Sequence, residues 1–283
     1  MSVPAPAARV TLERPRLELS GPKLARAFET LVSAAEETGG VERYVDALKL
    51  KSTFFAETLA GGRVRELQPD AFRALCAWMA TVRRRIGTHA GAPGFEAMRE
   101  RLSGLLAGAE RTDDADARIE AFCDAFPRDR AHRWVRDLAA EVLHNVDPER
   151  YPLMCRWVWD ARTDMGALRE IWHAEDVDRV TIGVPSRYET FLVLREELSQ
   201  FLAGQGVYRD VMFFVDLLCA QVYASYIHEQ GGTYLRADFA NAEEPMMHVR
   251  YLLGLDAVAR DGRGRVKSTD GDASIVDDTP RLA

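Results

Sequence analysis

Apolar side chains recur every three to four residues through much of the chain, which is the spacing that lines one face of an α-helix. This pattern predicts helices over residues 22–38, 41–59 and 69–86, and each stretch is followed by one or two glycines, which favour a helix end. The same spacing predicts shorter helices over residues 95–106, 119–127 and 128–145. The first half of the chain is therefore expected to be a succession of helices.

The middle of the chain has weaker patterns. Short helices are predicted around residues 153–160 and 165–173. Residues 180–184, Val-Thr-Ile-Gly-Val, are the best candidate for a strand because β-branched side chains favour extended backbone. One short strand cannot form a sheet, so this segment does not change the expected fold class.

Two longer helices are predicted beyond this segment. Ser186 and Glu189 fit the capping box, in which the hydroxyl and the carboxylate satisfy free backbone N–H groups, so a helix is expected to begin there. Residues 210–230 are apolar on nearly every side, which indicates a helix buried at the centre of the fold. A last short helix is predicted over residues 245–253.

Together these stripes predict an all-α fold with about nine to eleven helices. Residues 1–19, rich in Pro, Ala and Arg, are expected to form a flexible arm, and residues 257–283, rich in Gly, Asp, Ser and Arg, a disordered tail. A single helical domain is expected over residues 20–256, with possible internal boundaries near residues 108–114 or 174–185.

Composition and charge narrow the classes of partner. Apolar residues make up 47% and charged residues 29% of the 283 residues, which is the balance of an ordinary globular protein with a sizeable core. The net charge of -7 argues against a dedicated nucleic-acid binder, because neutralising phosphates needs a basic surface. The most basic runs, residues 83–85 and the arginines between residues 128 and 136, are interpreted as solvated helix faces.

The compartment is inferred from the cysteines and from the absence of a long apolar run. The four cysteines are far apart and form no C-x-x-C pair, so buried thiols in a reducing compartment are expected. The N-terminus does not resemble a secretory signal. Asp216, Gln221 and Ser225 interrupt the longest apolar window, so we expect no membrane span and a cytoplasmic protein.

Two Glu-x-x-His spacings are the sharpest chemical signal: Glu141 with His144, and Glu170 with His173. Positions i and i+3 share a helix face, so each pair could present a carboxylate and an imidazole to one metal ion. Helical di-iron and di-manganese proteins join two such pairs. The pattern therefore predicts, as one alternative, a metal site for iron, manganese or zinc.

Other features weigh against that metal site. The stretch between the two pairs contains Pro148 and Pro152 instead of the long helix that such bundles place there. With 44 acidic residues and six histidines, chance matches to the spacing are expected. The alternative is that these side chains cap helices, lie on the surface, or are partly buried with hydrogen-bond partners inside the protein.

Residues 148–160 have the most unusual composition, with two prolines, a tyrosine, two tryptophans and two arginines in thirteen residues. Tryptophan and arginine are enriched at binding hot spots, so this segment is a candidate recognition surface. The candidate partner-binding residues are Arg150, Tyr151, Arg156, Trp157 and Trp159. The alternative is that the aromatic side chains anchor a corner of the core.

No nucleophile elbow or phosphate-binding loop occurs, and no motif identifies a family. The leading hypothesis is a non-catalytic accessory or adaptor protein that acts on another protein, needs no cofactor and is not an enzyme. A metal-dependent helical enzyme is the alternative, and a nucleic-acid-associated helical protein using the arginines of residues 128–136 is the third.

Overall fold

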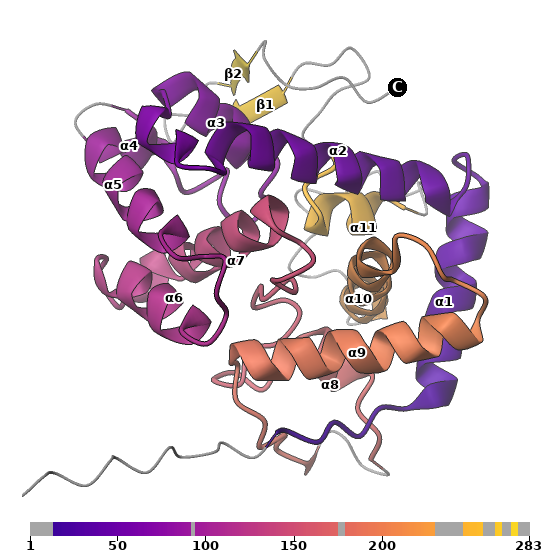
Figure 1. The fold of residues 1–283 in the computed structure, drawn as a ribbon. Coiled ribbons are helices and arrows are strands. Elements are labelled where there is room, and N and C mark those ends of the chain that lie inside the picture. Colours follow the sequence, from indigo (N-terminus) through magenta and orange to yellow (C-terminus); the bar gives the residue numbers. More distant parts are fainter. Residues whose placement is uncertain are drawn as a thin grey trace, which may run out of the picture.

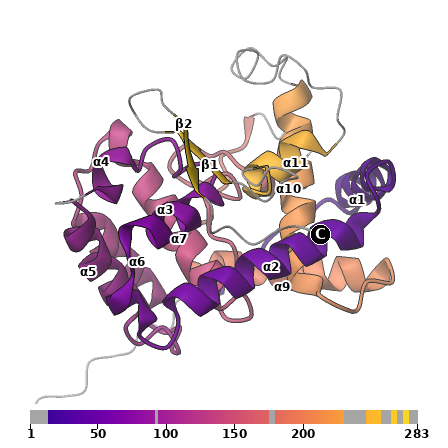
Figure 2. The same cartoon turned by 90° about the horizontal axis from the view of Figure 1, so that it is seen from above.

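The structure is a computed structural model that describes residues 14–91, 94–174, 179–229, 246–256, 264–267 and 273–276. These residues form eleven α-helices, two 3-10 helices and two short strands (Figures 1 and 2). The all-α fold class predicted from the sequence is confirmed. The domain bounds stay a prediction.

The α-helices are α1 Gly21–Glu36, α2 Val41–Leu59, α3 Pro69–Ala77, α4 Gly87–Ala90, α5 Gly94–Leu106, α6 Ala115–Asp124, α7 Trp134–Val146, α8 Ala167–Glu170, α9 Tyr188–Gly204, α10 Val211–Glu229 and α11 Met247–Leu252. The 3-10 helices are η1 Arg63–Glu66 and η2 Arg130–His132. Strands β1 Gly264–Lys267 and β2 Ala273–Val276 pair antiparallel, within the segment that the sequence predicts to be disordered.

Helix α10 lies at the centre of the fold and contacts α1, α2, α8, α9 and α11. In Figure 1 it is seen nearly along its axis, between α2 on one side and α9 on the other. By length and composition α10 could cross a membrane, but 56% of its most apolar window is buried inside the fold. Its apolar character on every side is explained by neighbours on every side, as the sequence pattern indicates.

The remaining helices form a second group around α7. Helix α5 packs on α4, α6 and η1, α6 packs on α7, and α2 extends across both groups of helices and contacts both α7 and α10 (Figure 2). One continuous cluster of buried apolar side chains connects the two groups, from Leu24 on α1 to Leu255 after α11.

Three sequence predictions differ from the structure because tertiary contacts decide the local backbone. The helix predicted to reach residue 86 ends at Ala77, where the backbone of Gly254 packs against Trp78. Residues 153–160 form no helix, and only residues 156–158 make a turn. Residues 180–184 form no strand, and Ile182 N–H donates to the Asp164 carboxylate at 3.1 Å.

The capping box at the start of α9 is also wrong, although the helix itself is present. Helix α9 begins at Tyr188 with no side-chain cap. The Ser186 hydroxyl instead accepts a hydrogen bond from Ala161 N–H at 2.7 Å, and Glu189 pairs with Arg14 at 3.2 Å. Both groups are thus used in contacts between distant segments.

The end of the predicted N-terminal arm packs on the fold. Leu19 forms an antiparallel bridge with Trp172, and His173 N–H donates to Glu18 O at 2.8 Å. Residues 18 and 19 therefore have defined backbone partners, while residues 1–13 of the arm lie outside the described residues.

Candidate functional site

Helix α7 carries four polar side chains on a face that points into the core. Asp137, Glu141, His144 and Asn145 are each between 1% and 4% exposed. Their spacing of four, three and one residues places them on one side of the helix. Burying a charged group costs free energy unless the group is paired. The chemical role of this α7 polar face therefore depends on the partners of its side chains.

Glu141 is paired with a buried lysine. Lys51 on α2 lies 2.7 Å from the Glu141 carboxylate, and both side chains are 3% exposed. Lys51 Nζ also donates to Leu253 O at 3.0 Å, and Asn145 Nδ2 donates to the same Glu141 carboxylate oxygen at 3.1 Å. These contacts tie α7 to α2 and to the chain that follows α11.

His144 joins α7 to α10. Its Nδ1 lies 2.8 Å from Tyr151 O, and its Nε2 lies 2.9 Å from the carboxylate of Asp216, which is 4% exposed. Burial alone disfavours the charged imidazole, but the Asp216 carboxylate, together with the Tyr151 carbonyl and the Glu141 carboxylate, outweighs burial and raises the pKa of His144 above its ordinary value of 6.5. The pair is thus a buried ion pair between two core helices.

Asp137 holds the segment that follows α7. Its carboxylate accepts from the backbone N–H of Arg156 at 3.0 Å and from the guanidinium at 2.7 Å. Next to Arg156, burial raises the pKa of the Cys155 thiol, and the nearby carboxylates of Glu141 and Asp137 add to this effect. Cys155 is therefore a protonated core thiol and not an activated nucleophile.

The two Glu-x-x-His pairs have different surroundings. Glu141 and His144 are bound to Lys51 and Asp216, whereas Glu170 ends α8 and His173 follows it, near residue 18. The described residues contain no group of three or more His, Cys, Asp or Glu side chains that could hold a metal ion. The metal site thus stays a prediction from spacing alone.

The candidate recognition segment lies mostly in the core. Tyr151 and Trp159 are fully buried and Trp157 is 6% exposed, so their rings are unavailable to a partner in this conformation. Arg156 is held by Asp137 as described above. Of the five candidate residues only Arg150 has half of its side chain exposed, next to Asp147, with which it forms an ion pair.

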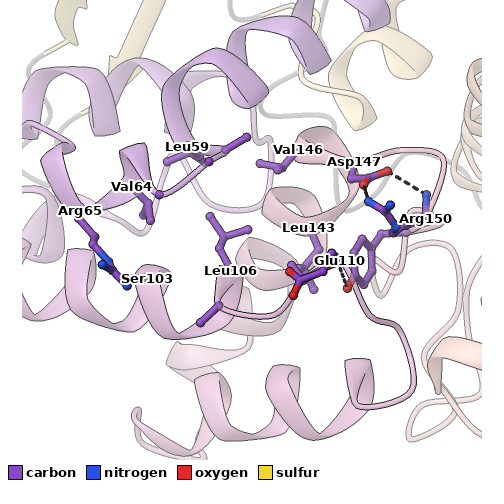
Figure 3. Close-up of a pocket in the computed structure, with 16 residues that line it drawn as sticks. Leu59, Val64, Arg65, Ser103, Leu106, Glu110, Leu143, Val146, Asp147 and Arg150 are labelled. Carbon is purple, nitrogen blue, oxygen red and sulfur yellow. Dashed lines mark hydrogen bonds and ion pairs between the residues drawn. The ribbon is translucent and has the colours of Figure 1, made fainter.

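Arg150 lies beside a surface cleft of about 330 Å³ (Figure 3). The cleft is bounded by the loop between α2 and η1, the C-terminal half of α5, and the C-terminal end of α7 with the loop that follows it. Its apolar floor consists of Leu59, Val64, Leu106, Leu143 and Val146. The glycines at residues 61 and 62, both at positive φ, turn the chain sharply at its edge.

The edge of the cleft carries charges of both signs. Asp147 and Arg150 neutralise each other, and Tyr151 Oη is hydrogen-bonded to Ala109 O at 2.7 Å. The Arg65 guanidinium and the Glu110 carboxylate are exposed and have no ion-pair or hydrogen-bond partner among the described residues. The cleft therefore offers an apolar surface and two charges that no other described side chain satisfies.

The arginines of the basic run after α6 do not line the cleft. Arg128 pairs with Glu120 at 2.7 Å and with Asp124, and Arg136 donates to Ser186 O at 2.7 Å. Arg130 and Arg133 are exposed. Two of the four arginines, Arg128 and Arg136, are thus engaged in contacts within the fold.

Sequence reasoning missed the partners of the α7 polar face and the whole cleft. One signal was present: Lys51 falls on the apolar stripe of α2, three residues after Leu48 and four before Phe55. Asp216 likewise interrupts the apolar helix α10. A charged residue on a buried stripe indicates a buried partner, but the sequence does not identify which one. The cleft has no such signal because three separate segments form it.

Comparison with known proteins finds no family model, no curated protein and no solved structure that matches this chain.

Proposed function

We propose that this protein is a non-catalytic accessory protein of the cytoplasm that binds a segment of another protein in the cleft between α2, α5 and α7. The observation that carries the proposal is the cleft itself, with its apolar floor and its unneutralised charges at Arg65 and Glu110. Exposed apolar surface with a polar rim is typical of interaction sites.

The buried polar groups support a binding role over a catalytic one. Asp137, Glu141 and His144 are three of the buried ionisable side chains of the core, and each is bound to a charged partner; the hollow that His144 and Asp216 line has a volume of only about 20 Å³. A general acid, base or metal ligand must reach substrate. Their contacts instead fix the scaffold on which the cleft is built, since α7 supplies Leu143 and Val146 to the floor.

A photo-crosslinking experiment tests the proposal. A photoreactive amino acid replaces Ser103, which lines the cleft, or, as a control, Met165, which is 41% exposed and does not line it. Irradiation of cells that express each variant is expected to give a crosslinked polypeptide from position 103 and not from position 165.

A matched pair of substitutions then tests the floor of the cleft. Leu106→Glu is expected to weaken binding of the crosslinked partner by about tenfold or more, because it places a charge on the apolar floor. Met165→Glu is expected to leave binding unchanged. Crosslinks of equal yield from both positions, or binding indifferent to Leu106→Glu, would contradict the proposal, as would a small molecule that native mass spectrometry finds bound in a Leu106-dependent manner.

A further inference from the structure

The cleft continues as a groove along α5. Arg65, Ser103 and Ala107 line both the cleft and a second, shallower hollow of about 800 Å³ that extends to Glu96. Where the two hollows join, the lining residues of α5 and of the position just after it are small: Ser103, Gly104 and Ala107. A groove of this form suits an extended ligand, because small side chains let a bound backbone approach the helix closely.

The positive and negative charges of the cleft lie at different ends of it. In Figure 3 Arg65 lies at one end of the labelled residues and Glu110 lies toward the other, beside the Asp147–Arg150 pair. Leu106 and Val64 lie between them. Because Asp147 and Arg150 cancel, the unneutralised charges among the residues that line the cleft are positive at Arg65 and negative at Glu110, and the exposed Glu100 carboxylate lies outside the cleft, in the second hollow.

We infer that the bound segment carries an acidic residue that pairs with Arg65, one or more apolar residues on the floor, and a basic residue that pairs with Glu110. This inference rests on the proposed function and adds the chemistry of the partner. The opposite charges at the two ends determine the direction in which the segment lies, because the reversed orientation would place like charges together.

Peptide display tests this inference without knowledge of the natural partner. A library of random peptides is selected on the wild-type protein and, in parallel, on Leu106→Glu to remove sequences that bind elsewhere. The retained peptides are expected to share an apolar residue flanked by an acidic residue on one side and a basic residue on the other, in one constant order.

The double charge reversal Arg65→Glu with Glu110→Lys gives the decisive comparison. Selection on this variant is expected to return peptides with the same apolar residue and the opposite order of charges, and wild-type peptides are expected to bind it at least about tenfold more weakly. Both side chains are exposed, so the fold should tolerate the exchange. Arg130→Glu, an exposed arginine that lines neither hollow, is the control and should select the wild-type pattern.

The outcomes separate the two proposals. Peptides that depend on Leu106 but show no charge order, or that ignore the double reversal, would overturn the inference and leave the binding cleft in place. Selection that yields no Leu106-dependent peptide would overturn both the inference and the proposed function.

Discussion

Lys51 and Glu141 stabilise the fold only as a pair, because each side chain is 3% exposed and bulk solvent hardly reaches either charge. Removing one partner leaves the other buried without its counter-charge, which typically costs more than the pair contributes when intact. The same reasoning applies to Asp216 with His144 and to Asp137 with Arg156. Substitutions at these few positions of the α7 polar face are therefore expected to change the free energy of unfolding strongly.

We expect Lys51→Met to lower the free energy of unfolding by about 3–5 kcal/mol, because Glu141 then keeps only Asn145 as a side-chain donor. The double variant Lys51→Met with Glu141→Leu should recover much of this loss, since no buried charge remains. Urea denaturation followed by circular dichroism measures both. Additive losses in the double variant would show that the two side chains do not act as a pair.

His144 gives the fold a defined pH dependence. Its pKa in the folded protein is raised above 6.5 by Asp216, so the folded state holds its proton more tightly than the unfolded state. The contribution to stability is therefore complete below about pH 6.5 and is lost as the pH rises through the raised pKa. Denaturation at a series of pH values should show wild-type stability falling over this window relative to Asp216→Asn, in which the charge is removed. Parallel pH profiles for the two proteins would contradict this account of His144.

At the scale of elements, the close approach of the chain after α11 to the loop after α3 depends on Gly254. Its φ is +75°, and a Cβ atom there would lie 1.8 Å from Trp78 O. We expect Gly254→Ala to destabilise the protein by at least about 2 kcal/mol, since strained φ and a backbone clash act together.

Gly104→Ala is the matched control for this substitution. Gly104 lies inside α5, and an added Cβ meets nothing within 4 Å. Alanine is the better helix former, so this variant should be more stable by about 0.5–1 kcal/mol. Thermal unfolding of both variants measures the difference, and equal effects would show that the approach to Trp78 is unimportant.

The sequence predicts a helix well when the spacing of apolar residues within that helix is enough to determine where it begins and ends. Helix α2 has the predicted bounds, and α1, α9 and α10 differ from their predicted bounds by a few residues. Residues 153–160 are different, because the Asp137 carboxylate binds Arg156 and holds the backbone there in a non-helical conformation. For the candidate site, spacing placed Glu141 and His144 on one face, but their partners lie on α2 and α10, and spacing carries no information about such distant segments.

At the scale of the whole molecule, α10 should be the last part of the fold to open. Five helices surround it, and most of its residues from 213 to 224 are buried. We expect the backbone amides of these residues to exchange with deuterium only through global unfolding, with exchange free energies equal to that measured by denaturation. Amides of α4, a helix of four residues near the surface, should exchange through smaller openings. Fast exchange in α10 in the absence of denaturant would contradict its central role.

The hydrogen bond from Lys51 to Leu253 O also has a consequence for synthesis, because 202 residues separate the two groups. At about 5–20 residues per second, the ribosome needs roughly 10–40 s to pass from the first group to the second. For most of that interval the nascent α1 and α2 lack α10, residues 211–229, the helix against which both pack. Their apolar stripes are then open to chaperones, and the newly made chain can complete its core only after the codons for α11 have been read.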